Sequence, residues 1–482
     1  SFEAASAAVE VRRNLVLSPN GVTTSGVSAY GSATLTTGSE YLTITTPGAA
    51  ANEGAHFGSL GASAAVDVVS GSIEVLASAG ASLYVQLRNK GSATGGDVVN
   101  LNILGTGQWE SYTLNGAKNT TGAATSHQIM IRTRTAQAVT ILARHALIEE
   151  RATVGGAYFD GSTSPDPDLT PSWTGTANAS ESVLKGNYPS QYIRISNSTL
   201  LLRSSQWRSS GNYSMRISPT DASNNTGVLI AGAPGGLAGV GVTFVPGTRY
   251  TITCKMYLAA PQTGTISAVG RTIRAMRDGF VQVNMSPQAP NTAGVHDLRL
   301  EVTVPPDATA FQVYAYNGAS ANNGDVWIDD LMIVEGTQNI PYFDGSASPD
   351  PDLEASWVGT PHNSASVLKG VRPFGYNGHP SNGSIVVQSS MWSERGSWSV
   401  RITGGVRTSS DHFVDIPNPI WTTLKGKRVT VMVTVRLEAP LEGISQHTGS
   451  RSVYVGAPSG AKTSPKVPNV AGTWFELTDN VN

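Results

Sequence analysis

A 29-residue segment occurs twice in the chain, and it constrains the architecture more than any other feature. The copies, Tyr158–Gly186 and Tyr342–Gly370, are identical at 21 of 29 aligned positions without a gap, at a constant offset of 184 residues. Solenoid repeats have periods of roughly 20 to 50 residues, so this spacing indicates that a whole domain was duplicated together with its connector. Two connectors and 482 residues predict three domains of ordinary size.

Short strands joined by tight turns are favoured by the composition. The chain has 52 glycines and 26 prolines, whereas charged residues make up only 14% of it. Apolar and polar residues alternate in short runs between clusters of Gly, Ser, Asn and Thr, which is typical of half-buried strands. We therefore predict an all-β fold of three related tandem β-sandwiches joined by short proline-containing connectors.

The run RYTITCKMYL, residues 249–258, shows this alternation clearly. One face of the run is apolar and consists of Tyr250, Ile252, Cys254, Met256 and Leu258. Cys254 is the only cysteine, so it cannot form an intrachain disulfide. We predict that it lies in the core of its sandwich.

The repeat sets the predicted domain boundaries. They are an N-terminal extension (1–11), sandwich 1 (12–150), connector 1 (151–187), sandwich 2 (188–336), connector 2 (337–370) and sandwich 3 (371–482). The third block has no counterpart of the first block's runs at 127–134 and 138–150. We therefore expect sandwich 3 to lack its C-terminal strands, which further residues of a longer polypeptide or another chain would supply.

The charge balance argues against two kinds of partner. Lys and Arg number 32 against 34 acidic residues, a net charge of −2 that offers no electrostatic attraction for a nucleic-acid backbone. A run of about 18 apolar residues, which a membrane-spanning helix needs, is absent from the sequence. We predict neither nucleic-acid binding nor membrane insertion.

Each connector combines a turn, a stiffened extended piece and three aromatic residues. Asp-Gly at 160–161 and 344–345 is a turn dipeptide, and two prolines follow in each S-P-D-P-D run. The aromatic residues are large enough to anchor the connector against a neighbouring sandwich. The predicted docking residues are Tyr158, Phe159, Trp173, Tyr342, Phe343 and Trp357.

The connector pattern YFDG…W-x-GT…S-x-S and the RRNLVLSPN run at 12–20 resemble minor tail proteins of tailed bacteriophages that infect actinobacteria. In that family, jelly-roll modules similar to carbohydrate-binding modules alternate with this segment. The resemblance covers the whole chain. It implies a structural virion component at the tail tip, whose partners are other tail proteins and further copies of itself, with host-envelope glycan as a further candidate partner.

A rival interpretation remains open at this point. Tandem carbohydrate-binding-module-like sandwiches also suit a secreted bacterial carbohydrate-binding protein, or the accessory part of a glycoside hydrolase. A signal peptide or a catalytic domain upstream would favour this alternative, whereas neighbouring tail genes would favour the virion.

Paired carboxylates are the residues that could carry catalysis or bind a cation. The pairs are Asp166/Asp168, Asp350/Asp352 and Asp329/Asp330. The first two lie in stiff connectors without a pocket-forming context, and the first block has Arg144 and His145 where the second has Asp329 and Asp330. We therefore expect no catalytic residue, no enzyme activity and no cofactor, and we leave a structural Ca²⁺ open.

Tryptophans are the candidates for glycan binding, because sugars stack on exposed aromatic rings. Four are considered: Trp207, Trp392, Trp398 and Trp421. A sandwich core also needs large aromatic residues, so a core position is the alternative for each. The third block has the most tryptophans in the fewest residues and is the predicted glycan-binding module.

Overall fold

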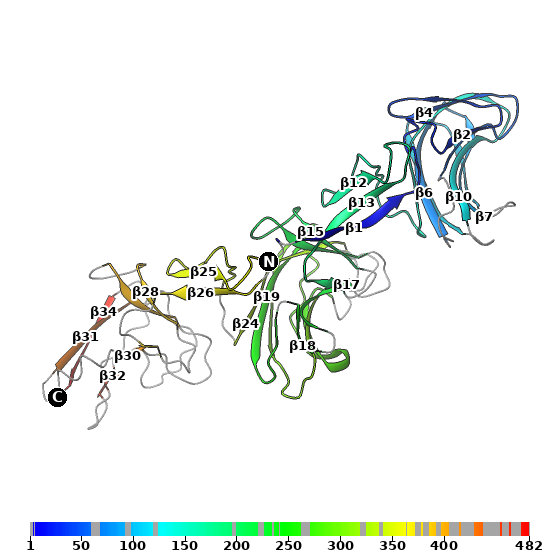
Figure 1. Ribbon diagram of the computed structural model, residues 1–482. Coiled ribbons are helices and arrows are strands. Elements are labelled where there is room, and N and C mark those ends of the chain that lie inside the picture. The colour runs from blue at the N-terminus through cyan, green and yellow to red at the C-terminus, as the bar shows by residue number, and fades with distance from the viewer. Residues whose placement is uncertain are drawn as a thin grey trace.

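The computed structural model describes most of the first two sandwiches, both connectors and short parts of the third sandwich. The described residues are 3, 5–58, 68–91, 98–118, 124–194, 199–219, 226–233, 236–240, 242–261, 270–318, 324–336, 341–362, 364–371, 377–378, 385–391, 397–403, 414–415, 429–436, 454–455, 462–463 and 474–481. The first two sandwiches and the described strands of the third block follow one another along an extended molecule, with one small sheet before the second sandwich and another after it (Figure 1).

The first sandwich consists of ten strands in two five-stranded antiparallel sheets. Their orders are β2-β5-β10-β7-β8 and β3-β4-β11-β6-β9. The strands are β2 (Val27–Tyr30), β3 (Thr34–Thr37), β4 (Leu42–Pro47), β5 (Gly54–Gly58), β6 (Val68–Ala77), β7 (Ser82–Gly91), β8 (Val98–Leu104), β9 (Glu110–Lys118), β10 (Ala124–Thr133) and β11 (Ala138–Glu149).

The second sandwich repeats this topology strand for strand, with β18 added at one edge. Its sheets have the orders β14-β17-β23-β20-β21 and β15-β16-β24-β19-β22. The strands are β14 (Ile193–Arg194), β15 (Thr199–Ser204), β16 (Ser214–Pro219), β17 (Thr226–Ala233), β18 (Gly236–Val240), β19 (Arg249–Leu258), β20 (Ile273–Arg277), β21 (Val281–Met285), β22 (Gly294–Thr303), β23 (Phe311–Gly318) and β24 (Val326–Glu335). The prediction of an all-β fold of tandem sandwiches is confirmed.

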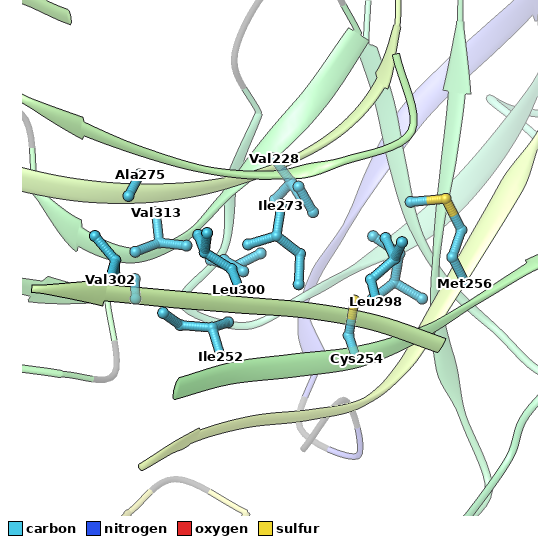
Figure 2. Close-up of a cluster of buried hydrophobic side chains, with 14 of the residues drawn as sticks. Val228, Ile252, Cys254, Met256, Ile273, Ala275, Leu298, Leu300, Val302 and Val313 are labelled. Atoms are coloured by element: carbon cyan, nitrogen blue, oxygen red, sulfur yellow. The ribbon is translucent and has the colours of Figure 1, made fainter. Parts of the chain in front are cut away.

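The core of the second sandwich lies between its two sheets. Figure 2 shows side chains of β19 and β22 facing side chains of β17, β20 and β23. Cys254 is 3% exposed and belongs to this core, as the alternation predicted. Burial of each large aliphatic side chain contributes about 1.5–3 kcal/mol. Within the described residues, one short 3₁₀ turn (Asp278–Phe280) is the only helical element. This part of the chain has no helix that is long and apolar enough to cross a membrane.

Described strands of the third sandwich occur as four separate pairs. These are β27–β30, β28–β29, β31–β34 and β32–β33. Their bounds are β27 (Asn377–Gly378), β28 (Ile385–Ser389), β29 (Ser399–Thr403), β30 (Val414–Asp415), β31 (Val429–Arg436), β32 (Tyr454–Val455), β33 (Lys462–Thr463) and β34 (Trp474–Val481). In the second sandwich, the corresponding pairs are joined by β23 and β24, the central strands of its sheets. That two further strands complete the third sandwich stays a prediction.

The connectors form small sheets of their own. In connector 1, β13 (Ser182–Pro189) pairs with β12 (Leu169–Trp173) on one edge and with β1 (Ala5–Asn14) on the other. In connector 2, β25 (Leu353–Trp357) pairs with β26 (Ser366–Gly370) in the same register. Strand β1 therefore crosses the boundary predicted at residue 12 and joins the N-terminal segment to connector 1.

Candidate functional site

The turn of each connector closes on the tryptophan of the same connector. Asp160 Oδ1 accepts hydrogen bonds from the N–H groups of Ser162 and Thr163, each at 2.8 Å. A Cβ atom at Gly161 would lie 2.3 Å from the Trp173 ring, so a glycine is required there. Gly345 stands in the same relation to Trp357, with the same 2.3 Å. This contact explains why YFDG and the tryptophan recur at a fixed spacing.

The paired carboxylates of each connector form ion pairs with an arginine of the sandwich that follows. Arg216 Nη1 lies 2.7 Å from Asp166 Oδ2 and 3.1 Å from Asp168 Oδ2. Arg401 forms ion pairs with Asp350 and, at 2.8 Å, with Asp352. The side chains of Asp168 and Asp352 are each only 1% exposed. We call each arrangement an arginine clamp; it gives the carboxylate pairs, considered above for catalysis or Ca²⁺, a structural role.

The clamp has the electrostatics of a partly buried ion pair. Burial alone would raise the pKa of Asp350. The hydrogen bond from the Arg401 guanidinium, the hydrogen bond from the Asp352 N–H and the positive charge of Arg401 together outweigh burial and hold the pKa below its usual range. Backbone groups add to the contact, because Ser205 N donates to Asp168 Oδ1 at 3.1 Å and Ser390 N donates to Asp352 Oδ1 at 3.2 Å. The connector is therefore attached to the following sandwich by several charge-assisted hydrogen bonds.

Connector 1 is also attached to the sandwich that precedes it. Phe159 is fully buried in a small apolar cluster with Leu147 of β11 and Leu202 of β15, which belong to different sandwiches. The Arg12 guanidinium lies 4.8 Å from the Phe159 ring centre, and Asn14 Nδ2 donates to Phe159 O at 3.3 Å. Among the predicted docking residues, Phe159 thus makes the contact between sandwiches.

Tyr158 and the two connector tryptophans have more local contacts. Tyr158 stacks on His145 of β11 with ring centres 4.3 Å apart, and its hydroxyl donates to Asp160 Oδ2 at 3.0 Å. Trp173 and Trp357 pack against the turns of their own connectors, as described above. These tryptophans close each connector on itself, whereas the contacts of Phe159 extend to both neighbouring sandwiches.

Connector 2 is more open toward the preceding sandwich. Tyr342, Phe343 and Leu368 are half-buried, although Phe159 and Leu184, which match the last two, are fully buried in connector 1. A cavity of about 510 Å³ lies at this junction, lined by Phe343, Asp329 of β24 and other residues. Within the described residues, β26 pairs with β25 alone, so connector 2 has no counterpart of the cover that β1 gives connector 1.

The predicted glycan-binding tryptophans are distributed as follows. Trp207 is half-buried and stacks on Tyr257, with ring centres 5.0 Å apart and planes 10° apart. Trp398 is 56% exposed. Trp392 and Trp421 lie outside the described residues.

The outward face of the β2-β5-β10-β7-β8 sheet carries aromatic and polar side chains together. Inward residues of these strands, such as Val85 and Ile129, belong to the core, so alternate residues point outward. The strand register arranges the outward residues in two rows. One row is Tyr30, Gly54, Arg132, Tyr84 and Asn102, and the other is Ser28, His56, Met130, Gln86 and Asn100. We call these residues the tyrosine face.

Polar contacts hold the tyrosine face together. Arg132 Nη2 donates to Gln86 Oε1, and Gln86 Nε2 donates to Asn100 Oδ1. The Arg132 guanidinium carbon lies 5.1 Å from the Tyr30 ring centre, yet Tyr30 remains 43% exposed. An exposed ring beside amide and guanidinium donors can stack on a sugar and hydrogen-bond its hydroxyl groups.

Sequence reasoning missed the tyrosine face and both clamp arginines. One predicted strand has polar or aromatic side chains on its outward face, namely Tyr84, Gln86 and Arg88. This alternation could have indicated the tyrosine face. The arginines also occupy matching places, in S-M-R-I-S at 214–218 and S-V-R-I-T at 399–403. Tryptophans were predicted as the glycan-binding residues because a large aromatic ring is visible in the sequence. The sequence does not show which residues of five different strands lie next to one another in the sheet.

Comparisons with known proteins give no family for the chain. No family model and no curated protein matches it. Among solved structures, it is similar to the N-terminal CBM22-1–CBM22-2 tandem domain of Paenibacillus barcinonensis Xyn10C, at 15% identity over 69% of this chain and 100% of that one, with a TM-score of 0.23. It is also similar to the C-terminal family 22 carbohydrate-binding module of Clostridium thermocellum Xyn10B, at 17% identity over 30% of this chain and 86% of that one, with a TM-score of 0.22. Likeness at these TM-scores does not bear on function.

Proposed function

We propose that the chain is a non-enzymatic structural protein of a bacteriophage virion, located at the tail tip, with host-surface glycan as a ligand of its first sandwich. The observation that carries the structural part is the arginine clamp, which recurs in both connectors. A clamp at each connector fixes the orientation of the following sandwich, as a protein that positions modules in an assembly requires. The location in a virion is proposed because the YFDG and RRN runs resemble those of bacteriophage minor tail proteins.

The duplicated contacts support a positioning role over a flexible tether. A flexible linker would leave its charged groups in water, because burying an uncompensated charge is costly. Here the carboxylates of Asp168 and Asp352 are buried and paired in both connectors. Residues of the connector are thus used to hold a fixed geometry, and the partners of such a chain are other tail proteins and further copies of itself.

The tyrosine face supports the glycan contact. It offers Tyr30 and Tyr84 as stacking surfaces and Gln86, Asn100 and Arg132 as hydrogen-bonding groups on one sheet. This combination favours saccharide binding over protein docking, because polar groups are distributed between the rings.

A secreted bacterial carbohydrate-binding protein is the second candidate function. The tyrosine face fits that function equally well, and the clamps would then space binding modules along a cell-wall polysaccharide. The two candidates differ in where the protein is found.

Electron microscopy of virions labelled with antibody to this chain separates the candidates. The virion proposal expects label at the tail tip and loss of label when the antibody is first absorbed with purified chain. Unlabelled virions, together with label on the surface or in the medium of the bacterial culture, would overturn the proposal in favour of the secreted protein.

A further inference from the structure

The tyrosine face belongs to a sheet with an unusual charge content. The whole chain has slightly more acidic than basic residues, yet the strands β2, β5, β7, β8 and β10 contain no aspartate or glutamate. The same strands carry Arg88 and Arg132, and Arg134 follows β10 directly. Positive charge on this face is therefore not balanced by acidic residues of its own sheet.

On the opposite sheet of the same sandwich, charged residues form ion pairs. Arg144 of β11 pairs with Glu74 at 2.8 Å, and Glu149 of β11 pairs with Arg12 of β1 at 2.8 Å. On the tyrosine face, Arg132 instead donates to the neutral side chain of Gln86. Within the described residues, no ion pair involves Arg132 or Arg134. Their charge is available to a ligand.

Each tyrosine of the face has a guanidinium beside its ring. Arg132 lies 5.1 Å from the ring centre of Tyr30, and Arg134 lies 5.5 Å from that of Tyr84. Neighbouring strands are about 4.8 Å apart, and the two tyrosines are three strands apart, so they stand about 14 Å apart across the sheet. Arg132, on β10, lies between them. A ligand that engages both rings must be an oligosaccharide, and it passes directly over a positive charge.

We propose that the tyrosine face binds an acidic glycan, whose sugar rings stack on Tyr30 and Tyr84 and whose anionic groups pair with Arg132 and Arg134. This inference rests on the glycan contact proposed above and specifies its chemistry. A neutral glycan would leave the two guanidinium groups without a charged partner in the complex, whereas carboxylate or phosphodiester groups form charge-assisted hydrogen bonds with them.

The second sandwich provides an internal control. On its matching sheet, Arg274 lies 5.5 Å from the ring centre of Tyr316, so the pairing of arginine with tyrosine recurs. However, Tyr314 and Tyr316 are only 3% and 6% exposed. Their rings cannot receive a sugar, and a variant at Arg274 should leave glycan binding unchanged.

Binding of the full chain to an anionic polymer and to the neutral ester of the same polymer tests the inference. The probes are polygalacturonate and its fully methyl-esterified form, with affinity measured by isothermal titration calorimetry at low and high salt. We expect at least a tenfold preference for the acid form, which is lost at high salt because the anionic groups are screened. Arg134→Gln should remove much of the preference and leave binding of the ester unchanged, Arg132→Gln should weaken binding of the acid form more than that of the ester, and Arg274→Gln should have no effect.

The outcomes separate the inference from the function on which it rests. Equal binding of both polymers, or a preference that survives both arginine substitutions, would overturn the acidic ligand and leave the glycan contact standing. Failure to bind either polymer or isolated host-wall polysaccharide would overturn both. Arg134 is exposed, so its variant remains informative even if Arg132→Gln were to impair folding, which circular dichroism would reveal.

Discussion

Replacing Arg216 with methionine should release connector 1 from the second sandwich while both sandwiches stay folded. The substitution keeps most of the side-chain volume but leaves the buried carboxylate of Asp168 without its cation. Loss of one partner of a buried ion pair costs about 3–5 kcal/mol. Ser205 N and Gln206 Nε2 still donate to Asp168, at 3.1 and 2.6 Å, so we expect the lower end of this range, about 3 kcal/mol.

The measurement is small-angle scattering of the full chain, combined with limited proteolysis within 163–168. The Arg216→Met variant should give a broader distribution of molecular dimensions and faster cleavage of the connector. Arg249→Met is the matched control, because Arg249 lies in the same sandwich and pairs with Glu301, but the two side chains are 48% and 32% exposed. Exposed pairs contribute only about 0.2–1 kcal/mol, so the control should behave as the wild type.

The double variant Arg216→Met with Asp168→Asn provides the sharpest refutation. If the arginine acts through Asp168, removing the carboxylate's charge should recover much of the loss, and the two effects should not add. Additive effects, or scattering and proteolysis unchanged by Arg216→Met, would show that the clamp does not hold the connector.

Three further predictions follow from the same geometry. Phe159→Ala should weaken the docking of connector 1 by about 3–4 kcal/mol because Phe159 is fully buried. Phe343→Ala should weaken the docking of connector 2 by clearly less, and the rate of proteolysis of each connector in the two variants measures the difference. The pKa of Asp350 is depressed in the folded chain, so its pairing with Arg401 stabilises the chain at pH values above the ordinary carboxylate pKa of about 3.9. This stabilisation is lost as the pH falls through the folded pKa. Scattering recorded from pH 6 to pH 2 should therefore show connector 2 opening only at the acid end, and opening at pH 5 would contradict the assignment. Burial raises the pKa of Cys254 to about 12, so a thiol reagent at pH 8 should modify it only after unfolding.

The fold could be predicted because its determinants are local. Alternation in residues 249–258 placed Cys254 and its neighbours on the inward face of β19, and the structure confirms it. A strand's two faces differ by a period of two that is written in consecutive residues. The duplication then extended the prediction from one sandwich to the next.

The site residues could be predicted only in part because they depend on contacts distant in sequence. Arg216 and Asp166 are 50 residues apart, and neither is unusual in its own segment. Tyr30 and Tyr84 come together only through the pairing of β2, β5, β10 and β7. Turn and proline patterns located the connectors, but the arginines that hold them lie in otherwise ordinary strands.

The two connectors have similar sequences but differ in their contacts with the part of the chain that precedes them. They share 21 of 29 residues, and each is clamped to the sandwich after it, so the contacts on their other side distinguish them. Arg12 and Asn14 of β1 cover Phe159 in connector 1, whereas Phe343 remains half-buried beside a cavity. Bending should therefore concentrate between the second sandwich and connector 2, and a disulfide engineered across that junction should narrow the scattering distribution more than one placed across the junction of the first sandwich with connector 1.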